Sequence, residues 1–125
     1  MMRTEPGVSR GLASISVRDS VVVCPIVRGE IRFGISKLSQ GKRRTALENA
    51  ARRLFASIPC EPVPESAGDH YAAIKLLRQR QGLSLDESDL WIAATAMALN
   101  ATLVSRDRDF NDIQGLRIEQ PAPNS

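Results

Sequence analysis

The sequence predicts an α/β fold in which a mostly parallel central sheet is flanked by helices. Two short runs of β-branched and apolar residues, Val21–Cys24 and Thr102–Ser105, are typical of buried strands. Between them lie segments whose apolar residues recur at helical spacing. Strands that are separated by helices pair in parallel in most α/β domains, and the helices then cover the sheet.

Four helices are expected between these two strands. Pro25 suits the first turn of a helix, and Gly82 suits the position just after the end of one. The proline-rich segment 59–64 predicts a loop or a short edge segment. The predicted helices are Pro25–Leu38, Lys42–Ser57, Ala67–Arg80 and Asp86–Asn100.

The two ends of the chain complete the expected domain. Val8, Leu12 and Ile15 share one helical face and predict a short helix over Val8–Ser16. A short turn is expected over Phe110–Gly115, followed by a last strand over Leu116–Glu119. We expect one domain over residues 1–120 and a flexible tail over residues 121–125.

Composition and charge narrow the class of protein. A formal net charge of +3 favours polyanionic partners, either a nucleic acid or an acidic protein. Aromatic residues make up only 4% of the chain, which disfavours an aromatic platform for single-stranded nucleic acid. The two cysteines, Cys24 and Cys60, form no CxxC motif and predict reduced, packed thiols of a cytoplasmic protein. No segment resembles a signal peptide or a membrane span.

Three acidic residues follow the expected strands or open a helix. Ligands of open α/β sheets bind beyond the C-terminal ends of the strands, so these acids are candidate site residues. Glu30 flanks the apolar stripe of its helix, although it could also be a surface residue paired with Arg28 or Lys37. Asp89 precedes Ile92, Ala93 and Ala96 on one helical face. Its alternative role is that of a first-turn acid behind an N-cap at Asp86. Asp107, with Asp109 after it, follows the Thr102–Ser105 strand, where turn-forming Asp is also common.

Together these acids predict a site for a hard cation. Mg²⁺ and Mn²⁺ prefer oxygen ligands, and Mg²⁺ usually retains waters beside one or two carboxylates. Such ions activate water and stabilise the leaving oxygen when a phosphodiester is cleaved. Other chemistries have less support, because His70 is the one histidine and there is no nucleophile motif, P-loop or zinc ligand set.

Three segments, in this order, resemble the toxin-type members of the PIN-domain family. Segment 27–38, VRGEIRFGISKL, resembles their AELRYGIEKL helix. Segment 89–96, DLWIAATA, resembles their D-x-x-IAA-x-A helix. Segment 103–110, LVSRDRDF, with IQGL at 113–116, resembles their LVTxDxDFxxIxGL ending.

The resemblance implies a VapC-type toxin of a toxin–antitoxin system, an endoribonuclease that needs Mg²⁺ or Mn²⁺. Glu30, Asp89 and Asp107 would then be the catalytic, metal-binding acids, and Ser105 would replace the hydroxyl residue that orients them. RNA would be the substrate. Such toxins are usually homodimers that are neutralised by a VapB-like antitoxin.

One departure from the family concerns its first strand, which ends in LDTN or LDTD and supplies a further metal-binding aspartate. Residues 1–6 resemble the end of the helix that follows that strand, so we expect the strand and its aspartate to be missing. Glu5 and Asp19 are candidate substitutes, but neither follows an apolar strand. Two other functions therefore remain open. One is an impaired PIN remnant that only dimerises or binds antitoxin or RNA, and the other is a nucleic-acid-binding domain that uses only its arginines.

Overall fold

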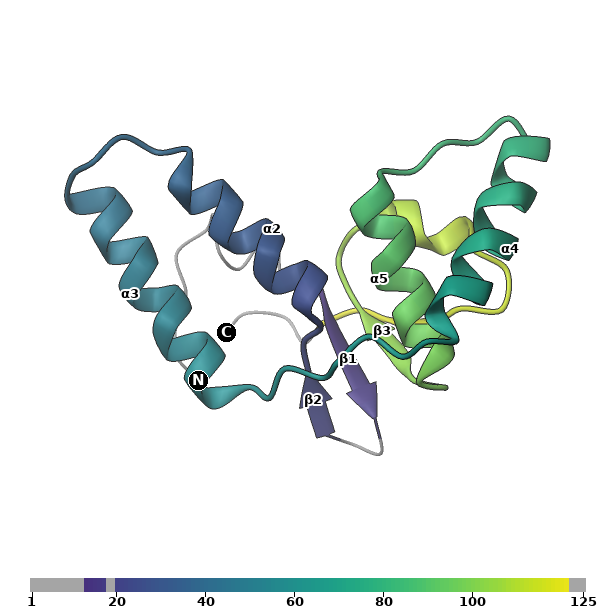
Figure 1. Cartoon of the computed structure of the whole chain (residues 1–125), viewed down its shortest axis with the longest axis horizontal. Coiled ribbons are helices and arrows are strands. Elements are labelled where there is room, and N and C mark those ends of the chain that lie inside the picture. The colour runs from purple at the N-terminus through teal and green to yellow at the C-terminus, as the bar shows by residue number, and fades with distance from the viewer. Residues whose placement is uncertain (1–12, 18–19, 122–125) are drawn as a thin grey trace.

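The structure is a computed structural model that describes residues 13–17 and 20–121 of the chain. Figure 1 shows the pair α2–α3 on one side and the pair α4–α5 on the other, with β1 and β2 between them. The elements, in chain order, are β1 (Ser14–Val17), β2 (Ser20–Val22), α2 (Pro25–Ser36), α3 (Lys42–Ser57), α4 (Ala67–Arg80), α5 (Glu87–Ala98), β3 (Thr102–Val104), the 3-10 helix η1 (Arg108–Asp112) and β4 (Arg117–Glu119).

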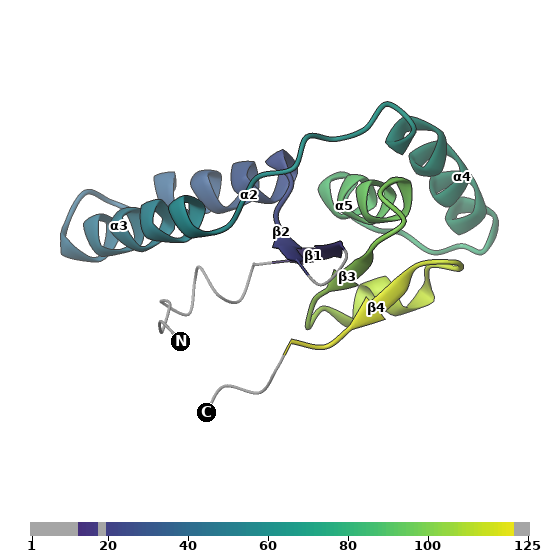
Figure 2. The same ribbon diagram turned by 90° about the horizontal axis from the view of Figure 1, so that it is seen from below.

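The four strands form one sheet in the order β2-β1-β3-β4. Strand β1 pairs antiparallel with both of its neighbours, whereas β3 and β4 are parallel. Ile15 lies opposite Val22 on one side and Leu103 on the other. Figure 2 shows this sheet beside α5. The expectation of a helix-flanked α/β fold is confirmed, but the described sheet is mixed rather than mostly parallel.

The prediction of a helix over Val8–Ser16 is wrong for its last residues, because Ser14–Val17 form β1. Val8 to Leu12 lie outside the described residues. The segment Ser14–Val17 alternates polar and apolar side chains, which is the period of a strand. Ile15 is fully buried between its two strand partners. Tertiary pairing therefore overrides the helical spacing of Val8, Leu12 and Ile15.

The strand expected at Val21–Cys24 is shorter and differently paired than predicted. Strand β2 ends at Val22, and only two residues separate it from β1, a connection that allows only antiparallel pairing. Val23 instead makes a parallel bridge with Cys60, as its N–H donates to the Pro59 carbonyl at 3.0 Å. The proline-rich segment is therefore an edge segment, one of the two forms expected of it.

The helices agree closely with the sequence prediction. Helices α3 and α4 have the expected bounds, whereas α2 and α5 are shorter at their ends. Pro25 is the first residue of α2, and Gly82, at φ 72°, follows α4. Gly82 can adopt this left-handed conformation without the clash that a side chain would cause. The last strand is observed as β4, and the expected turn at Phe110–Gly115 overlaps η1.

Helix α5 is the centre of the core and is buried on almost every side. Ile92, Ala93, Ala94 and Ala96 are at most 1% exposed. The helix contacts α2, α4 and β3, so it joins both helix pairs to the sheet. Within it Thr95 is also fully buried, and its hydroxyl donates to the Trp91 carbonyl at 2.7 Å. A helix that is apolar all round is typical of a fully buried element.

Helix α4 holds the beginning of α5 in place. The rings of Tyr71 and Trp91 stack with centroids 4.2 Å apart and planes 8° from parallel. The Tyr71 hydroxyl also donates to the Glu87 carboxylate. The buried Arg78 donates to the Ser84 carbonyl at 3.0 Å and so fixes the loop that leads into α5. These contacts position the first turn of α5, which carries Asp89.

Three further predictions concern membrane spans, the two cysteines and the C-terminal tail. In the described part of the chain, no helix has the length and apolar character needed to cross a membrane. Neither cysteine forms a disulfide, but only Cys24 is packed, because Cys60 is exposed on the edge segment. Of the expected flexible tail, residues 122–125 lie outside the described residues.

Replacing Ile15 by alanine should test the central position of β1. The side chain is fully buried between two strands, so Ile15→Ala should lower the free energy of unfolding by about 2–5 kcal/mol. The matched control is Val21→Ala on β2, whose side chain is 46% exposed and should change stability by less than about 1 kcal/mol. Urea denaturation followed by circular dichroism measures both. Equal effects of the two substitutions would contradict the central placement of β1.

Candidate active site

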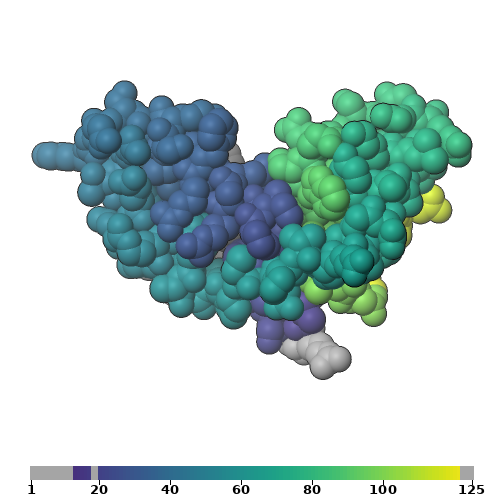
Figure 3. All heavy atoms as spheres, viewed as in Figure 1, coloured from purple at the N-terminus to yellow at the C-terminus, as the bar shows by residue number. Residues whose placement is uncertain are grey.

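The predicted site residues lie where α2, the first turn of α5 and the end of β3 approach one another. Glu30 is on α2, Asp89 is on α5, and Asp107 follows β3. The space-filling view shows the surface hollowed between the α2–α3 and α4–α5 sides of the molecule (Figure 3). Acidic side chains from three distant parts of the sequence are therefore brought to one region.

A hydrogen bond between Ser88 and Glu30 connects α5 to α2 in this region. The Ser88 hydroxyl donates to Glu30 Oε2 at 2.5 Å, across 58 positions of the sequence. In the described part of the chain Glu30 has no ion pair with Arg28 or Lys37, so the surface pairing considered for it is not observed. Sequence reasoning missed Ser88, whose only signal was its place beside Asp89 in the first turn of α5.

The Asp89 carboxyl is the electrostatic centre of the region. Partial burial raises its pKa from the ordinary value of 3.8 to about 6, and the neighbouring carboxylates act in the same direction. Those neighbours are Glu30, Asp107, Asp86 and Asp109, in decreasing order of effect. Both desolvation and nearby negative charge disfavour the ionised form of an acid. The raised pKa of Asp89 therefore reports that the three predicted acids share one electrostatic environment.

Asp107 is held in a defined turn at the end of β3. Its backbone N–H donates to the buried Ser105 hydroxyl at 3.1 Å, and its own Oδ1 accepts from the Asp109 N–H at 2.9 Å. Asp107 thus caps η1, which is the turn-forming role considered for it, while one carboxylate oxygen remains without a described partner. Ser105 orients the backbone of Asp107 rather than its carboxylate.

Two other sequence expectations concern the helix starts and the histidine. Asp86 occupies the N-cap position of α5, but its side chain makes no capping hydrogen bond. Its carboxylate acts instead on Asp89 through charge. His70 is half-buried on α4, and its predicted place outside the site stays a prediction.

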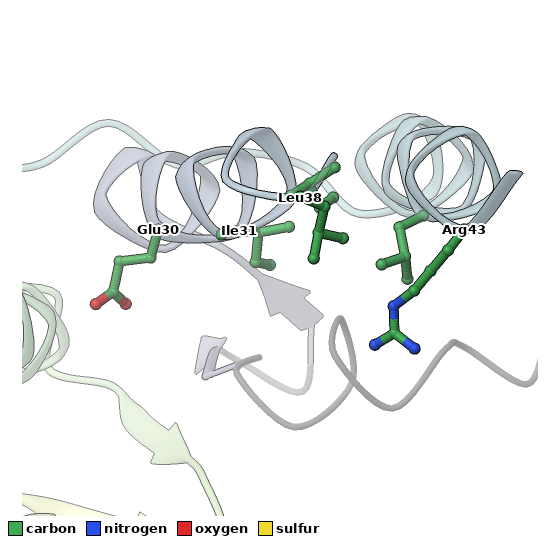
Figure 4. A pocket seen from close by; sticks show the side chains of 7 residues that line it. Glu30, Ile31, Leu38 and Arg43 are labelled. Carbon is green, nitrogen blue, oxygen red and sulfur yellow. The ribbon is translucent and has the colours of Figure 1, made fainter. Parts of the chain in front are cut away.

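A cavity of about 290 Å³ begins at Glu30 and extends between α2 and α3. Figure 4 shows Glu30 at one end and Arg43 at the other, with Ile31 and Leu38 between them. The floor of the cavity is apolar, and its two ends carry opposite charges. Of the three predicted acids, it is Glu30 that borders this groove.

The chain matches the PIN domain over residues 2–116. It belongs to the PIN-domain family. Among curated proteins, it is 27% identical over 106 residues to VapC ribonuclease Y4jK of Sinorhizobium fredii, an alignment that covers 82% of this chain and 76% of the relative.

Solved structures support the same PIN-domain fold. The chain resembles VapBC2 from Rickettsia felis bound to a DNA fragment from their promoter, with a TM-score of 0.73 at 24% identity, over 82% of this chain and 75% of that one. It also resembles VapBC-5 from Mycobacterium tuberculosis, a member of the VapBC family of toxin–antitoxin systems, with a TM-score of 0.72 at 20% identity, over 80% and 81% of the two chains.

The donor chemistry of this PIN domain fits a hard divalent cation, because the site consists of carboxylate and hydroxyl oxygens. Asp89, with its raised pKa, is an acid whose ionised form a cation would stabilise. Within the described residues, however, no three His, Cys, Asp or Glu side chains are close enough to hold one ion together. The arrangement therefore fits an ion held by one or two carboxylates and by waters, which is common for Mg²⁺. The assignment of Glu30, Asp89 and Asp107 as ligands remains a prediction.

The raised pKa of Asp89 predicts that this residue destabilises the metal-free PIN domain above about pH 6. Between pH 3.8 and about 6 the folded state holds the Asp89 proton more tightly than the unfolded chain does. Stability contributed by this group therefore falls as the pH rises through that window. In EDTA at pH 7, Asp89→Asn should raise the free energy of unfolding by about 1 kcal/mol, since solvent screens the half-exposed carboxylate.

The gain in the free energy of unfolding that Asp89→Asn brings should shrink toward zero as the pH falls to 3.8, the ordinary pKa of this carboxyl. The matched control is Asp69→Asn, which replaces an exposed first-turn acid of α4 and removes a favourable interaction with the helix dipole. It should not stabilise the protein at any pH. Urea denaturation across the pH series decides the matter, and a stabilisation by Asp89→Asn that is independent of pH would disprove the role of its charge.

Proposed function

We propose that this PIN domain is a VapC-type toxin, an endoribonuclease that cleaves RNA phosphodiester bonds with Mg²⁺ or Mn²⁺. The observation that carries the proposal is the half-buried Asp89 carboxyl, whose pKa is raised to about 6 beside Glu30 and Asp107. A half-buried acid whose pKa is raised by burial and by neighbouring carboxylates is typical of a functional site. The similarity to a protein named VapC ribonuclease supports the choice of RNA as substrate.

In this proposal the chain supplies ligands, orientation and a local negative field. Asp89 and Glu30 would hold the ion, and the Ser88 hydroxyl fixes one oxygen of Glu30. Asp107, in the turn that Ser105 stabilises, would contribute its carboxylate directly or through a water. A bound Mg²⁺ or Mn²⁺ supplies a water of lowered pKa and stabilises charge on the phosphate.

The same proposal includes a protein partner. The solved structures that the chain resembles are VapBC assemblies, which supports a cognate VapB-like antitoxin that neutralises the nuclease. A homodimer is the assembly that the family resemblance implies. Size-exclusion chromatography with light scattering, with and without the co-expressed antitoxin, measures both associations.

The alternative is a PIN domain that binds RNA or antitoxin but does not cleave. The observation in its favour is that the described acids do not close into a set of three direct metal ligands. Both functions include binding of RNA or antitoxin, so binding alone does not separate them. Metal-dependent cleavage does separate them.

Asp89→Asn should abolish cleavage if the acidic region is the active site. With a long single-stranded RNA and Mg²⁺ or Mn²⁺, the rate should fall by roughly a hundredfold or more, the scale on which a misplaced reacting group slows an enzyme. Asp69→Asn is the control and should retain the full rate, because Asp69 is exposed on α4. Addition of EDTA should stop cleavage by the wild type. Cleavage that survives both EDTA and Asp89→Asn would refute the proposed function, and the absence of any cleavage would favour the binding-only alternative.

Ser88→Ala should weaken metal binding more than the chemical step. The substitution removes the hydrogen bond that orients Glu30, so the Mg²⁺ concentration for half-maximal cleavage should rise roughly tenfold, within the range for supporting residues of metal sites. At saturating Mg²⁺ most of the rate should return. The control is Ser84→Ala, since Ser84 is exposed and only its backbone carbonyl has a described partner. An unchanged Mg²⁺ dependence in Ser88→Ala would remove Ser88 from the site.

A further inference from the structure

Positive charge is concentrated on the helical pair α2–α3. Residues 25–57 contain eight Lys and Arg against two Glu, whereas the rest of the chain has nine basic and twelve acidic residues. This segment therefore carries a formal charge of +6 in a chain whose net charge is +3. Of its eight basic residues, only Arg44 has a described ion-pair partner, Glu48 at 3.4 Å. A basic surface of this kind attracts a polyanion.

Two of these arginines are fixed in place by one aromatic ring. Arg28 and Arg32 lie one turn apart on α2, and both guanidinium groups lie over the Phe55 ring of α3, at 4.8 and 5.5 Å from its centroid. Both residues are exposed. The arginine hydrogen bonds found in the described part of the chain belong to other residues, namely Arg44, Arg52, Arg78 and Arg117.

Stacking on an aromatic ring leaves the N–H groups of a guanidinium available. Each group keeps five N–H donors in a fixed fork that matches two oxygens of a phosphate. Because Phe55 holds the planar groups, less side-chain freedom is lost when a ligand binds. The guanidinium groups of Arg28 and Arg32 are therefore suited to bind two neighbouring phosphates rather than an apolar surface.

The arginine pair lies on the opposite flank of α2 from the acidic region. Glu30 points toward Ser88 of α5, whereas its neighbours two positions away on either side lie over α3. The distance across a helix with its side chains is about 10–12 Å. A single strand of a few nucleotides spans that distance. Between the two flanks, the surface of α2 exposes Phe33, over whose ring Lys37 lies at 4.8 Å.

We propose that Arg28 and Arg32, held against Phe55, form a docking site for the phosphate backbone of the RNA that is cleaved beside Glu30. The inference rests on the proposed ribonuclease function and adds where the substrate is held outside the acidic region. The RNA strand crosses the exposed side of α2, with its phosphates on the arginine pair and its scissile bond at Asp89. Such contacts hold the strand without reading its sequence.

The test compares Arg28→Gln/Arg32→Gln with the wild type in two assays. In EDTA, where no cleavage occurs, fluorescence anisotropy with a labelled single-stranded RNA should give a Kd about tenfold higher for the double variant. The slope of log Kd against log salt should fall by about 0.7 for each phosphate that the variant no longer neutralises. In Mg²⁺, KM should rise while kcat stays close to the wild-type value, because the arginines do not touch the reacting atoms.

Three further variants make the result specific. Arg80→Gln removes an exposed charge from α4 and should leave Kd, KM and the salt slope unchanged. Arg28→Lys/Arg32→Lys keeps the charge, so it should restore the salt slope but only part of the affinity, since lysine offers no fork. Phe55→Leu should weaken binding with the salt slope intact, because both charges remain.

The outcomes separate this inference from the proposed function. If the wild type cleaves RNA and the double variant has the same KM and salt slope, the docking site is wrong and the nuclease assignment stands. If no form cleaves but the double variant loses RNA affinity in EDTA, the docking site stands and the nuclease assignment fails. If the same substitutions weaken binding of duplex DNA as much as that of RNA, the assignment to RNA is overturned.

Discussion

The partial burial of the Asp89 carboxylate against an apolar helix is the constraint around which the rest of this PIN domain is arranged. Helix α5 is buried on almost every side, so its first turn emerges from the core with an acid that is only half in solvent. Removing a charge from water is unfavourable unless a partner compensates it. Here the nearby groups are themselves acidic, and the pKa of Asp89 rises to about 6. A cation placed beside Asp89 would stabilise the ionised form of this acid.

The α2–α3 side and the α5 side of the hollow surface differ in charge. The α5 side carries Asp86 and Asp89, whereas residues 25–57 of the α2–α3 side carry a formal charge of +6. Glu30 is the point at which the two meet, and Ser88 ties it to α5. A polyanion approaching this surface is attracted by α2–α3 and repelled by the carboxylates unless a cation is present. In the proposed function, RNA binding and cleavage would therefore involve neighbouring but separate parts of the molecule.

Local patterns in the sequence predicted the helices α2 to α5 and the strands β2, β3 and β4, but neither β1 nor the way in which the strands pair. The bounds of α3 and α4 follow from apolar spacing, a proline and glycines, all of which act within a few residues. Glu30, Asp89 and Asp107 could be predicted as site residues because each follows a strand or opens a helix, and the structure places them in one electrostatic environment. Strand β1 could not, because Ile15 is placed by Val22 and Leu103, and the latter lies far along the chain. The Ser88–Glu30 contact was hidden for the same reason, since a hydrogen bond across 58 positions leaves no periodic signal.

The pairing of β1 with β3 also determines the order in which the domain can assemble. Ile15 must meet Leu103, so the central pair of the sheet closes a loop that contains helices α2 to α5. Contacts between residues so distant in sequence form slowly, because closing the long loop between them costs chain entropy before the contacts can stabilise the fold. The pairs α2–α3 and α4–α5 need only local contacts and can form while the ribosome is still extending the chain. Asp107 follows β3 closely in the chain, so the acidic region is complete only once β3 has paired with β1.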